Sequence, residues 1–397
     1  MISKQLLEML FDAASMQRWN DHIRPHRGFT ELDKQAHKMI FAYVIAKFEE
    51  SERGASVNWQ GIIEGGLFEF FHRVKLTDLK PAIFHKVMEQ KSRELNEWVL
   101  KGIANSVKDV GDDFYGKFHR YLFEPEYMAL EKRILKAAHY LATNWEFEII
   151  YRLNSNLFGI EETKANIGNE IEEHFDLVGV QKIWLGKETH NFLDLIGQLR
   201  FQQRWAQSPR VPETSVLGHM LVVAVLSYLC SVEMGACSKR VYNDFYGGLF
   251  HDLPEVLTRD IISPVKDSVA GLDEIIKDIE AQQVEERIMT LVPDTWHKEI
   301  RYFIEDEFAS KIMRDGEPVR CSSAEISASY NSDKFSPIDG ELVRACDKLA
   351  AFIEASLSIS YGIKSRHLED GKKSSYASHG SSRIVDFNFR PLFDYFA

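Results

Sequence analysis

The sequence has few cysteines and no excess of positive charge. Its 4 cysteines show no Cys-x-x-Cys spacing, and three of them lie in or near apolar segments with helical periodicity. Such thiols pack as small hydrophobic groups, which predicts a reduced protein in the cytoplasm. The formal net charge of -12 argues against a nucleic-acid partner, because binding a polyanion requires a basic face.

Long apolar runs and a targeting pattern are also lacking. The longest apolar run, Met220–Leu229, is about half as long as a bilayer crossing requires. The first residues include neither a basic region nor a small-residue cleavage site, so we expect no export signal and no membrane partner. At 397 residues the chain is long enough for more than one domain.

An internal repeat is present instead. Gln17-Arg18-Trp19 recurs as Gln203-Arg204-Trp205. Glu31, His37 and the run Gly65–Phe68 recur, all at an offset of 182 residues, as Glu213, His219 and Gly247–Phe250. One offset shared over so long a segment predicts a tandem duplication with its junction near residue 185.

Helical periodicity dominates both halves. Apolar residues between Ile40 and Phe48 follow one helical face, and Val216–Tyr228 is apolar all round, as a buried central helix should be. Further predicted helices are Asn58–Phe71, Tyr127–Leu153, His190–Gln203, Val241–Phe250, Asp273–Leu291, Thr295–Ala309 and Asp339–Ser360. Strand alternation is scarce, so the predicted fold class is all-α.

Two polar segments read as loops. Asp315–Pro337 is rich in serine, and Ser365–Arg383 has the serine, lysine and glycine content of a mobile linker. The apolar residues after this linker, Ile384–Phe396, are expected to dock on the body of the protein or on a partner.

Four side chains in the second half suit a metal ion. They are His219, the pair His251-Asp252 at the end of a helix, and Asp347 within an apolar helix. A bound cation would offset the cost of burying the Asp347 carboxylate. The alternative interpretations are that His219 is an ordinary core residue and that Asp347 forms an ion pair within its own helix.

The order His, His-Asp, Asp resembles that of the HD-domain phosphohydrolases. Glu255 lies three residues after the His-Asp pair, Asp260 follows, and Arg204-Trp205 precedes the first histidine, as in the narrower group of HD-domain 5'-deoxynucleotidases. The resemblance implies a tandem repeat of two HD-domain helical bundles. The expected domains are a degenerate copy at 1–185, a catalytic copy at 186–364, and a linker with a docking tail at 365–397.

The resemblance also implies a role for each site residue. His219, His251, Asp252 and Asp347 would bind one divalent ion, which could be Mn, Co, Ni, Zn, Fe or Mg. Glu255 would protonate the leaving oxygen or orient the attacking water, together with Asp252. The substrate-binding residues would be Arg204 and Lys266 at the phosphate, Trp205 at the sugar and Asp260 at the 3'-hydroxyl. As structural alternatives, Arg204-Trp205 could end a helix, and Glu255 and Asp260 could be capping residues.

In the first half these positions are altered. At the shared offset Glu69 replaces His251, Phe70 replaces Asp252 and Arg73 replaces Glu255, while His139 corresponds to Asp347. His37, Glu69 and His139 could still bind a metal, but the loss of the acidic residues favours a structural copy. This copy would act as the partner of the second in an intrachain pseudo-dimer, and further homo-oligomers are possible.

The predicted function is a metal-dependent 5'-nucleotidase that converts (deoxy)nucleoside 5'-monophosphates, small-molecule substrates, to nucleoside and phosphate. One alternative is a dNTP triphosphohydrolase or a signalling-nucleotide hydrolase that uses the same site. The Gly-Tyr-Pro motif of cyclic-dinucleotide hydrolases is absent. A second alternative is a non-catalytic nucleotide-binding or scaffold protein.

Overall fold

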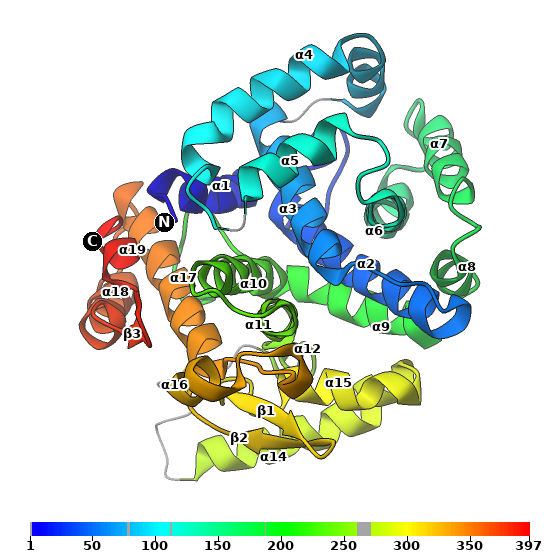
Figure 1. Cartoon of the computed structure of the whole chain (residues 1–397). Coiled ribbons are helices and arrows are strands. Elements are labelled where there is room, and N and C mark those ends of the chain that lie inside the picture. Colours follow the sequence, from blue (N-terminus) through cyan, green and yellow to red (C-terminus); the bar gives the residue numbers. More distant parts are fainter. Residues whose placement is uncertain (1, 78–79, 112, 187, 260–270) are drawn as a thin grey trace. The chain divides into compact units, whose positions relative to one another are not determined.

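The computed structural model describes residues 2–77, 80–111, 113–186, 188–259 and 271–397 (Figure 1). The chain is mostly helical, which confirms the predicted all-α class, and the strands of the described residues form two short antiparallel hairpins. Two compact units are present. Unit 1 comprises residues 1–181 and 232–235, and unit 2 comprises residues 182–231 and 236–397.

Unit 1 contains the first helices of the chain. They are α1 (Lys4–Ser15), α2 (Glu31–Arg53), α3 (Trp59–Leu76), α4 (Pro81–Val107), α5 (Phe114–Phe123), α6 (Ala129–Asn154) and α7 (Ile160–Glu172). The short α8 (Val178–Trp184) extends across the boundary between the units.

Unit 2 contains the later helices and both hairpins. Its α-helices are α9 (Glu188–Gly197), α10 (Val216–Glu233), α11 (Ser238–Phe250), α12 (Glu255–Thr258), α14 (Leu272–Gln283), α15 (Asp294–Ile304), α16 (Ser323–Glu325), α17 (Gly340–Ser360), α18 (Arg366–His379) and α19 (Arg390–Asp394). The hairpins are β1 (Lys311–Arg314) with β2 (Glu317–Arg320), and β3 (Arg383–Ile384) with β4 (Phe387–Asn388). Short 3-10 and π-helical turns occur at Gln198–Phe201, Val284–Ile288, Met289–Leu291, Ile326–Tyr330 and Asp333–Phe335.

Helix α2 forms the centre of unit 1. Thr30 caps its first turn by accepting a hydrogen bond from the backbone of Asp33, and Gly54 ends it with a φ of 63°, a backbone conformation that suits glycine. The helix packs along α6 and against α3. Every residue from Glu31 to Ala46 is buried, so the charged residues of its first turns lie inside the protein.

Helix α10 forms the centre of unit 2. Every residue from Val216 to Ser231 is buried, which confirms the predicted central helix. By length and composition α10 could cross a membrane, but 89% of this segment is buried inside the protein, as in the core helix of a globular protein. The next helix, α11, approaches it closely at Gly248, where an added Cβ atom would lie 2.9 Å from the Ala224 Cα atom.

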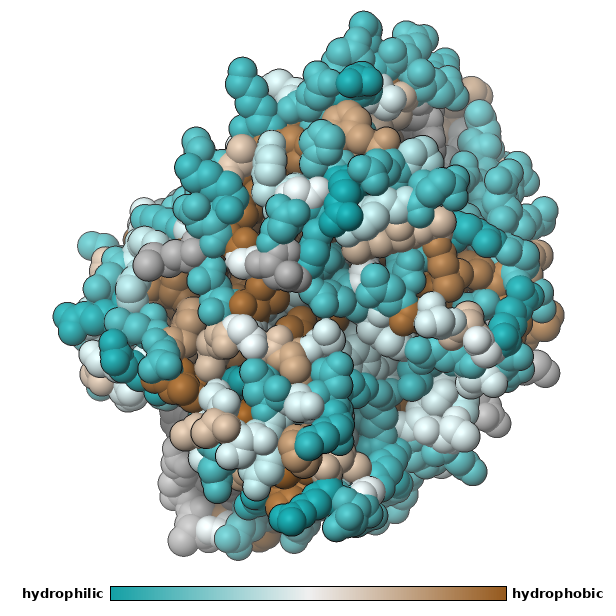
Figure 2. Space-filling view, viewed as in Figure 1, coloured by the Kyte–Doolittle hydropathy of each residue, from teal (hydrophilic) through white to brown (hydrophobic). Residues whose placement is uncertain are grey.

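The C-terminal segment is more regular than its composition suggests. Residues 366–379, which the sequence predicts to be a linker, form helix α18, because Ser365 caps it and Leu368 anchors it in the core. After the β3–β4 hairpin, the Phe393 ring of α19 packs against that of Phe352 in α17, with 4.9 Å between the ring centroids. The face shown in Figure 2 is largely hydrophilic, with smaller apolar areas.

Candidate metal centre

Three buried side chains of unit 2 converge from three helices. His219 lies on the first turn of α10, His251 directly follows α11, and Asp347 lies in the second turn of α17. One possible ligand atom of each lies within 4.8 Å of those of the others, and His219 Nε2 is 3.0 Å from an Asp347 oxygen. Divalent ions bind such ligands at about 2.0–2.2 Å, so opposite ligands lie roughly 4 Å apart. The three atoms are therefore close to bonding positions.

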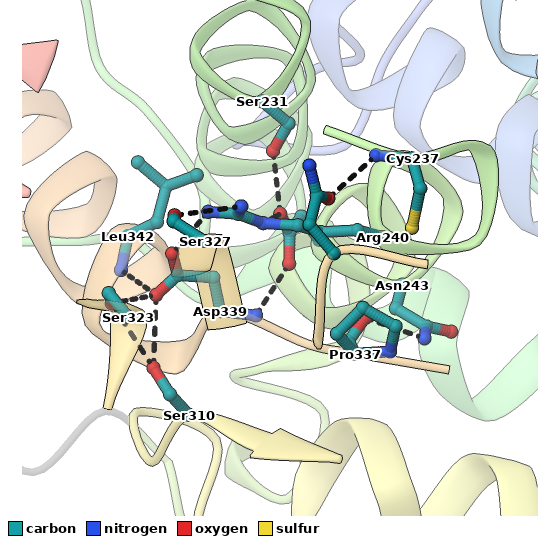
Figure 3. A network of polar contacts seen from close by, with 12 residues as sticks. Ser231, Cys237, Arg240, Asn243, Ser310, Ser323, Ser327, Pro337, Asp339 and Leu342 are labelled. Atoms are coloured by element: carbon teal, nitrogen blue, oxygen red, sulfur yellow. Dashed lines mark hydrogen bonds and ion pairs between the residues drawn. The ribbon is translucent and has the colours of Figure 1, made fainter. Parts of the chain in front are cut away.

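A buried polar network links the same three helices (Figure 3). Asp339 caps α17 through the backbone of Leu342 and pairs with the Arg240 guanidinium of α11 at 2.6 Å. Asp244 of α11 accepts hydrogen bonds from the Asp339 backbone at 2.7 Å and from the hydroxyl of Ser231 in α10 at 2.6 Å. Because these hydrogen bonds and the ion pair are buried, they hold the helices that carry the three side chains in fixed relative positions.

Glu354 orients His219 from the opposite side. This carboxylate is fully buried two helical turns after Asp347, and one of its oxygens lies 3.4 Å from His219 Nδ1, close enough for an electrostatic contact but without hydrogen-bond geometry. It also accepts hydrogen bonds from Thr214 at 2.8 Å and from the Trp205 indole at 3.0 Å. A carboxylate behind a histidine directs the other ring nitrogen toward a metal, so Glu354 is a positioning residue of this site.

The backbone orients His251 in a similar way. Its Nδ1 atom lies 2.8 Å from the Gly248 carbonyl oxygen, and a carbonyl only accepts, so Nδ1 carries the proton and donates it. Nε2 is then the available nitrogen. It lies 3.1 Å from Asp252 Oδ2, but the contact lacks hydrogen-bond geometry, and neither atom has a hydrogen-bond partner within the described part of the chain.

The charges of the site fit a cation. Burial opposes ionisation of Asp252 and Asp347, but the neighbouring histidines outweigh it and hold the pKa of each carboxyl below its ordinary value. Burial also opposes protonation of His251, but Asp252 outweighs this effect and raises the pKa of His251 to about 8. The two orphaned buried atoms, His251 Nε2 and Asp252 Oδ2, together with His219 and Asp347, are a nitrogen and oxygen donor set that suits a divalent transition metal.

The remaining predicted site residues are partly described. Arg204 lies beside the cluster, with its guanidinium 3.6 Å from Asp252 Oδ2, and Glu255 begins α12 in the turn after the His-Asp pair. Trp205 is half-buried with a φ of 57°, and its ring edge faces Gly371 of α18. Asp260 and Lys266 lie outside the described residues.

Two acidic residues near the site were not predicted from the sequence. One is Glu354. The sequence feature that could have identified it is its position in an apolar helix, seven residues and so two turns after Asp347. The other is Glu307, whose carboxyl interacts with His251 and Asp252. Burial raises the pKa of Glu307, while His251 counteracts this rise. No periodic pattern marked Glu307, because it follows the end of α15.

The sequence left open a metal site of His37, Glu69 and His139 in unit 1. His37 packs instead against the rings of Phe41 and Trp145, with centroids 4.6 Å and 5.2 Å away. The side chain that meets His139 is Lys34. Among the residues that the structure describes, only the cluster in unit 2 has the spacing of metal ligands. The described residues therefore give no support to a metal site of His37, Glu69 and His139, and the correspondence of His37 to His219 stays a prediction.

Comparison with known proteins gives the same segment a family. Residues 196–375 match a model of the HD domain. The chain is 27% identical over 128 residues to a 5'-deoxynucleotidase of Vibrio atlanticus (strain LGP32), a match that covers 32% of this chain and 65% of that protein. It is 26% identical over 129 residues to a 5'-deoxynucleotidase of Vibrio vulnificus (strain YJ016), covering 30% and 61%. The matches thus span less than two thirds of either relative. The matched segment contains the whole buried cluster of His219, His251 and Asp347, so the part of the chain that is similar to the HD domain is also the part that carries the candidate metal centre.

Proposed function

We propose that unit 2 is a divalent-metal-dependent phosphohydrolase, and specifically a 5'-nucleotidase that acts on deoxynucleoside 5'-monophosphates in the cytoplasm. The observation that carries the proposal is the buried cluster of two imidazoles and one carboxylate, with Asp252 beside it, inside a segment that matches the HD domain. The substrate class is supported by two relatives that are named 5'-deoxynucleotidases. Arg204 beside the cluster supports an anionic substrate.

The side chains of the site divide the work. His219, His251, Asp252 and Asp347 would hold the ion, which supplies Lewis acidity that polarises a phosphoryl group and lowers the pKa of water. Arg204 would bind a phosphate oxygen and hold the phosphorus in line with the attacking water. Glu255, in the turn after the His-Asp pair, would deliver a proton to the leaving 5'-oxygen.

Two residues outside the described segments complete the proposed substrate site. Asp260 would accept from the 3'-hydroxyl, and Lys266 would make a second contact to the phosphate. Trp205 would pack beside the sugar and disfavour a 2'-hydroxyl by its bulk. Its indole is held in place by Glu354, which supports a fixed wall at this position.

We also propose that the two units are copies of one HD-type bundle. Trp19 and Trp205 both have a φ of 57°, and each follows an arginine. The Trp19 indole donates to Glu146 at 2.9 Å, as that of Trp205 donates to Glu354 at 3.0 Å. A tryptophan rarely adopts a positive φ, so its recurrence with the same partner supports a common origin. The packing of the units as a pseudo-dimer stays a prediction.

A substrate screen tests the hydrolytic proposal. The metal-free protein is loaded with Mn, Co, Ni, Zn, Fe or Mg and assayed for phosphate release from ribo- and deoxynucleoside 5'-monophosphates. Glu255→Gln should lower kcat by about 100-fold or more, the range for loss of a general acid. Glu341→Gln, an exposed residue of α17, serves as the matched control. Turnover that survives Asp252→Ala at the wild-type rate would contradict the proposal.

The products separate the enzymatic alternatives. Release of nucleoside and phosphate supports the nucleotidase, whereas release of triphosphate from a dNTP would identify a triphosphohydrolase with the same site. Stabilisation by a nucleotide without turnover under any metal would identify a binding or scaffold protein.

A further inference from the structure

Unit 1 has a cluster of buried cations in the region that corresponds to the metal centre of unit 2. Lys34 and Lys38 of α2 are fully buried, and the half-buried Arg18 and Arg73 approach from the preceding loop and from α3. His139 of α6 completes the cluster. These residues all belong to unit 1, and none has a role in the proposed hydrolysis.

The capping residues show that Lys34 corresponds to His219. Thr30 caps α2 by accepting from the backbone three residues later, and Ser215 caps α10 in the same way. Lys34 and His219 each lie four residues after their cap. Counted from the caps, the offset between the units is 185 residues in this helix, three more than the offset of the glycine pairs.

The partners of the two side chains agree with this correspondence. Lys34 Nζ contacts His139 Nδ1, and His219 Nε2 contacts Asp347. Unit 1 therefore has a lysine amino group at the position that His219 occupies in the cluster of unit 2. A neutral imidazole stands where unit 2 has a carboxylate, because burial and the nearby cations lower the pKa of His139 well below its ordinary value.

The other ligand positions of unit 1 are blocked or reversed in charge. Glu69, the counterpart of His251, is held by Lys38 at 2.5 Å and by the Tyr121 hydroxyl at 2.6 Å. Phe70 replaces the metal-binding Asp252, and Arg73 replaces the acidic Glu255. The described residues show no metal-ligand cluster here, and the carboxylates Glu31, Glu69 and Glu146 are already paired with Arg18, Lys38 and Arg73.

Lys34 itself lacks the partner that a buried ammonium group needs. Its one hydrogen-bond partner is His139, and no carboxylate of the described residues forms an ion pair with it. Arg18 is held by Glu31 at 2.9 Å and by Glu146 at 2.8 Å, so nearby carboxylates are already engaged. Burial, with the nearby Arg18 and Lys38, holds the pKa of Lys34 well below its ordinary value although Glu31 counteracts this, so the amino group has unused donors and lacks the anion that would stabilise its charged form. Arg73 and His139 are only half-buried, unlike Lys34.

We propose that unit 1 binds the phosphate group of a phosphomonoester without a metal ion, through Lys34 and Arg73. Lysine offers three donors and arginine a paired set, which together suit the oxygens of a phosphate dianion. The absence of an acid at the position of Arg73 means that the ester is bound and not hydrolysed. The proposal that this site binds phosphate does not depend on the proposed hydrolytic function. The narrower proposal that the bound phosphomonoester is a nucleotide rests on that function.

Titration calorimetry on the full chain in EDTA tests this site. Inorganic phosphate and deoxyadenosine 5'-monophosphate serve as probes. We expect one phosphate site per chain without metal, and at least tenfold weaker binding by Lys34→Met and by Arg73→Gln. Lys101→Met, an exposed lysine of α4 in the same unit, should bind as the wild type does. Tighter binding of the nucleotide than of phosphate would identify a nucleotide site, and equal binding would identify a phosphate site.

Two results would overturn the proposal. One is wild-type protein that binds neither probe unless a metal is present, and the other is equal phosphate affinity in Lys34→Met and wild type. Lys34→Met removes a buried charge and should keep its fold, and the half-exposed Arg73→Gln provides a second variant. Loss of phosphatase activity in Asp252→Ala with unchanged binding in EDTA separates this site from the catalytic one.

Discussion

At the scale of single residues, orientation distinguishes the histidines of the metal centre from ordinary core histidines. Glu354 lies behind His219 and the Gly248 carbonyl lies behind His251, so each ring turns one nitrogen toward the cluster. Partners of this kind fix the tautomer and increase the basicity of the ligand. The partner of His251 is a backbone carbonyl, whereas the partner of His219 is the Glu354 side chain. Only the contact of Glu354 can therefore be tested by substituting a side chain.

Glu354→Gln should weaken metal binding about 10- to 100-fold, the range for loss of such a partner. The amide oxygen can still accept from Trp205, but the fully buried Arg210, 3.4 Å from Glu354, loses its charged partner, so the free energy of unfolding should also fall. Metal affinity is measured by competition with a chelator, and thermal unfolding of the metal-free protein is measured alongside. Glu341→Gln on the same helix is the control. An affinity within twofold of the wild type would show that Glu354 only stabilises the fold.

Metal affinity should also depend on pH through His251. Its pKa in the metal-free protein is about 8, and the ion needs the neutral ring. Affinity should therefore fall about tenfold per pH unit below pH 8. Stability of the metal-free protein should follow the opposite trend, because the folded pKa exceeds the ordinary value of about 6.5. This contribution is complete below pH 6.5 and is lost as the pH rises through 8, by about 2 kcal/mol. His251→Gln should remove this decline, and a variant that retains it would refute the assignment.

At the scale of elements, close contact between helices sets the position of the ligands. At Gly248, α11 approaches the backbone of α10, which cannot move aside as a side chain can. The corresponding Gly66 in α3 approaches Met39, where an added Cβ would meet the flexible end of the side chain. The same glycine thus has different constraints in the two units.

Gly248→Ala should destabilise unit 2 by about 1–3 kcal/mol, the usual cost of overpacking. The shift of α11 should also displace His251 and weaken metal binding. Gly66→Ala is the matched control, since Met39 can change rotamer and alanine is the better helix former by about 1 kcal/mol. Thermal unfolding and chelator competition measure both effects. If the two variants changed thermal stability and metal affinity by the same amount, the Gly248 contact would have no special role in positioning the site.

At the scale of the whole molecule, the sequence indicated the buried cluster of unit 2 more clearly than the side-chain contacts of unit 1. The ligand order in unit 2 is visible because His219, His251 and Asp347 keep their types and spacing. In unit 1, three more residues separate the start of the central helix from the glycine pair than in unit 2 (Thr30 to Gly65 against Ser215 to Gly247), so an ungapped comparison selected His37 and overlooked Lys34. Capping contacts reveal such a shift, and they require coordinates.

Other differences have similar physical causes. The polar composition of residues 366–379 predicted a mobile linker, but Ser365 caps this segment and Leu368 anchors it, so a helix forms. Glu354 was overlooked because a glutamate in a helix is usually solvated, and only its buried partners show its role. Composition reports average exposure, whereas these residues depend on particular tertiary contacts.

The difference between the units predicts where a metal acts in the full chain. An ion stabilises the unit that binds it, by about 2.7 kcal/mol at a concentration 100 times Kd. Hydrogen exchange of the full chain should therefore slow in peptides from α10, α11 and α17 when metal is added, while peptides from α2 and α6 exchange as before. Asp347→Asn should abolish the slowing. If metal also slowed hydrogen exchange in the peptide that contains Lys34, and did so in Asp347→Asn as well, an ion would bind in unit 1. That result would refute the idea that lysines have replaced a metal site in this unit.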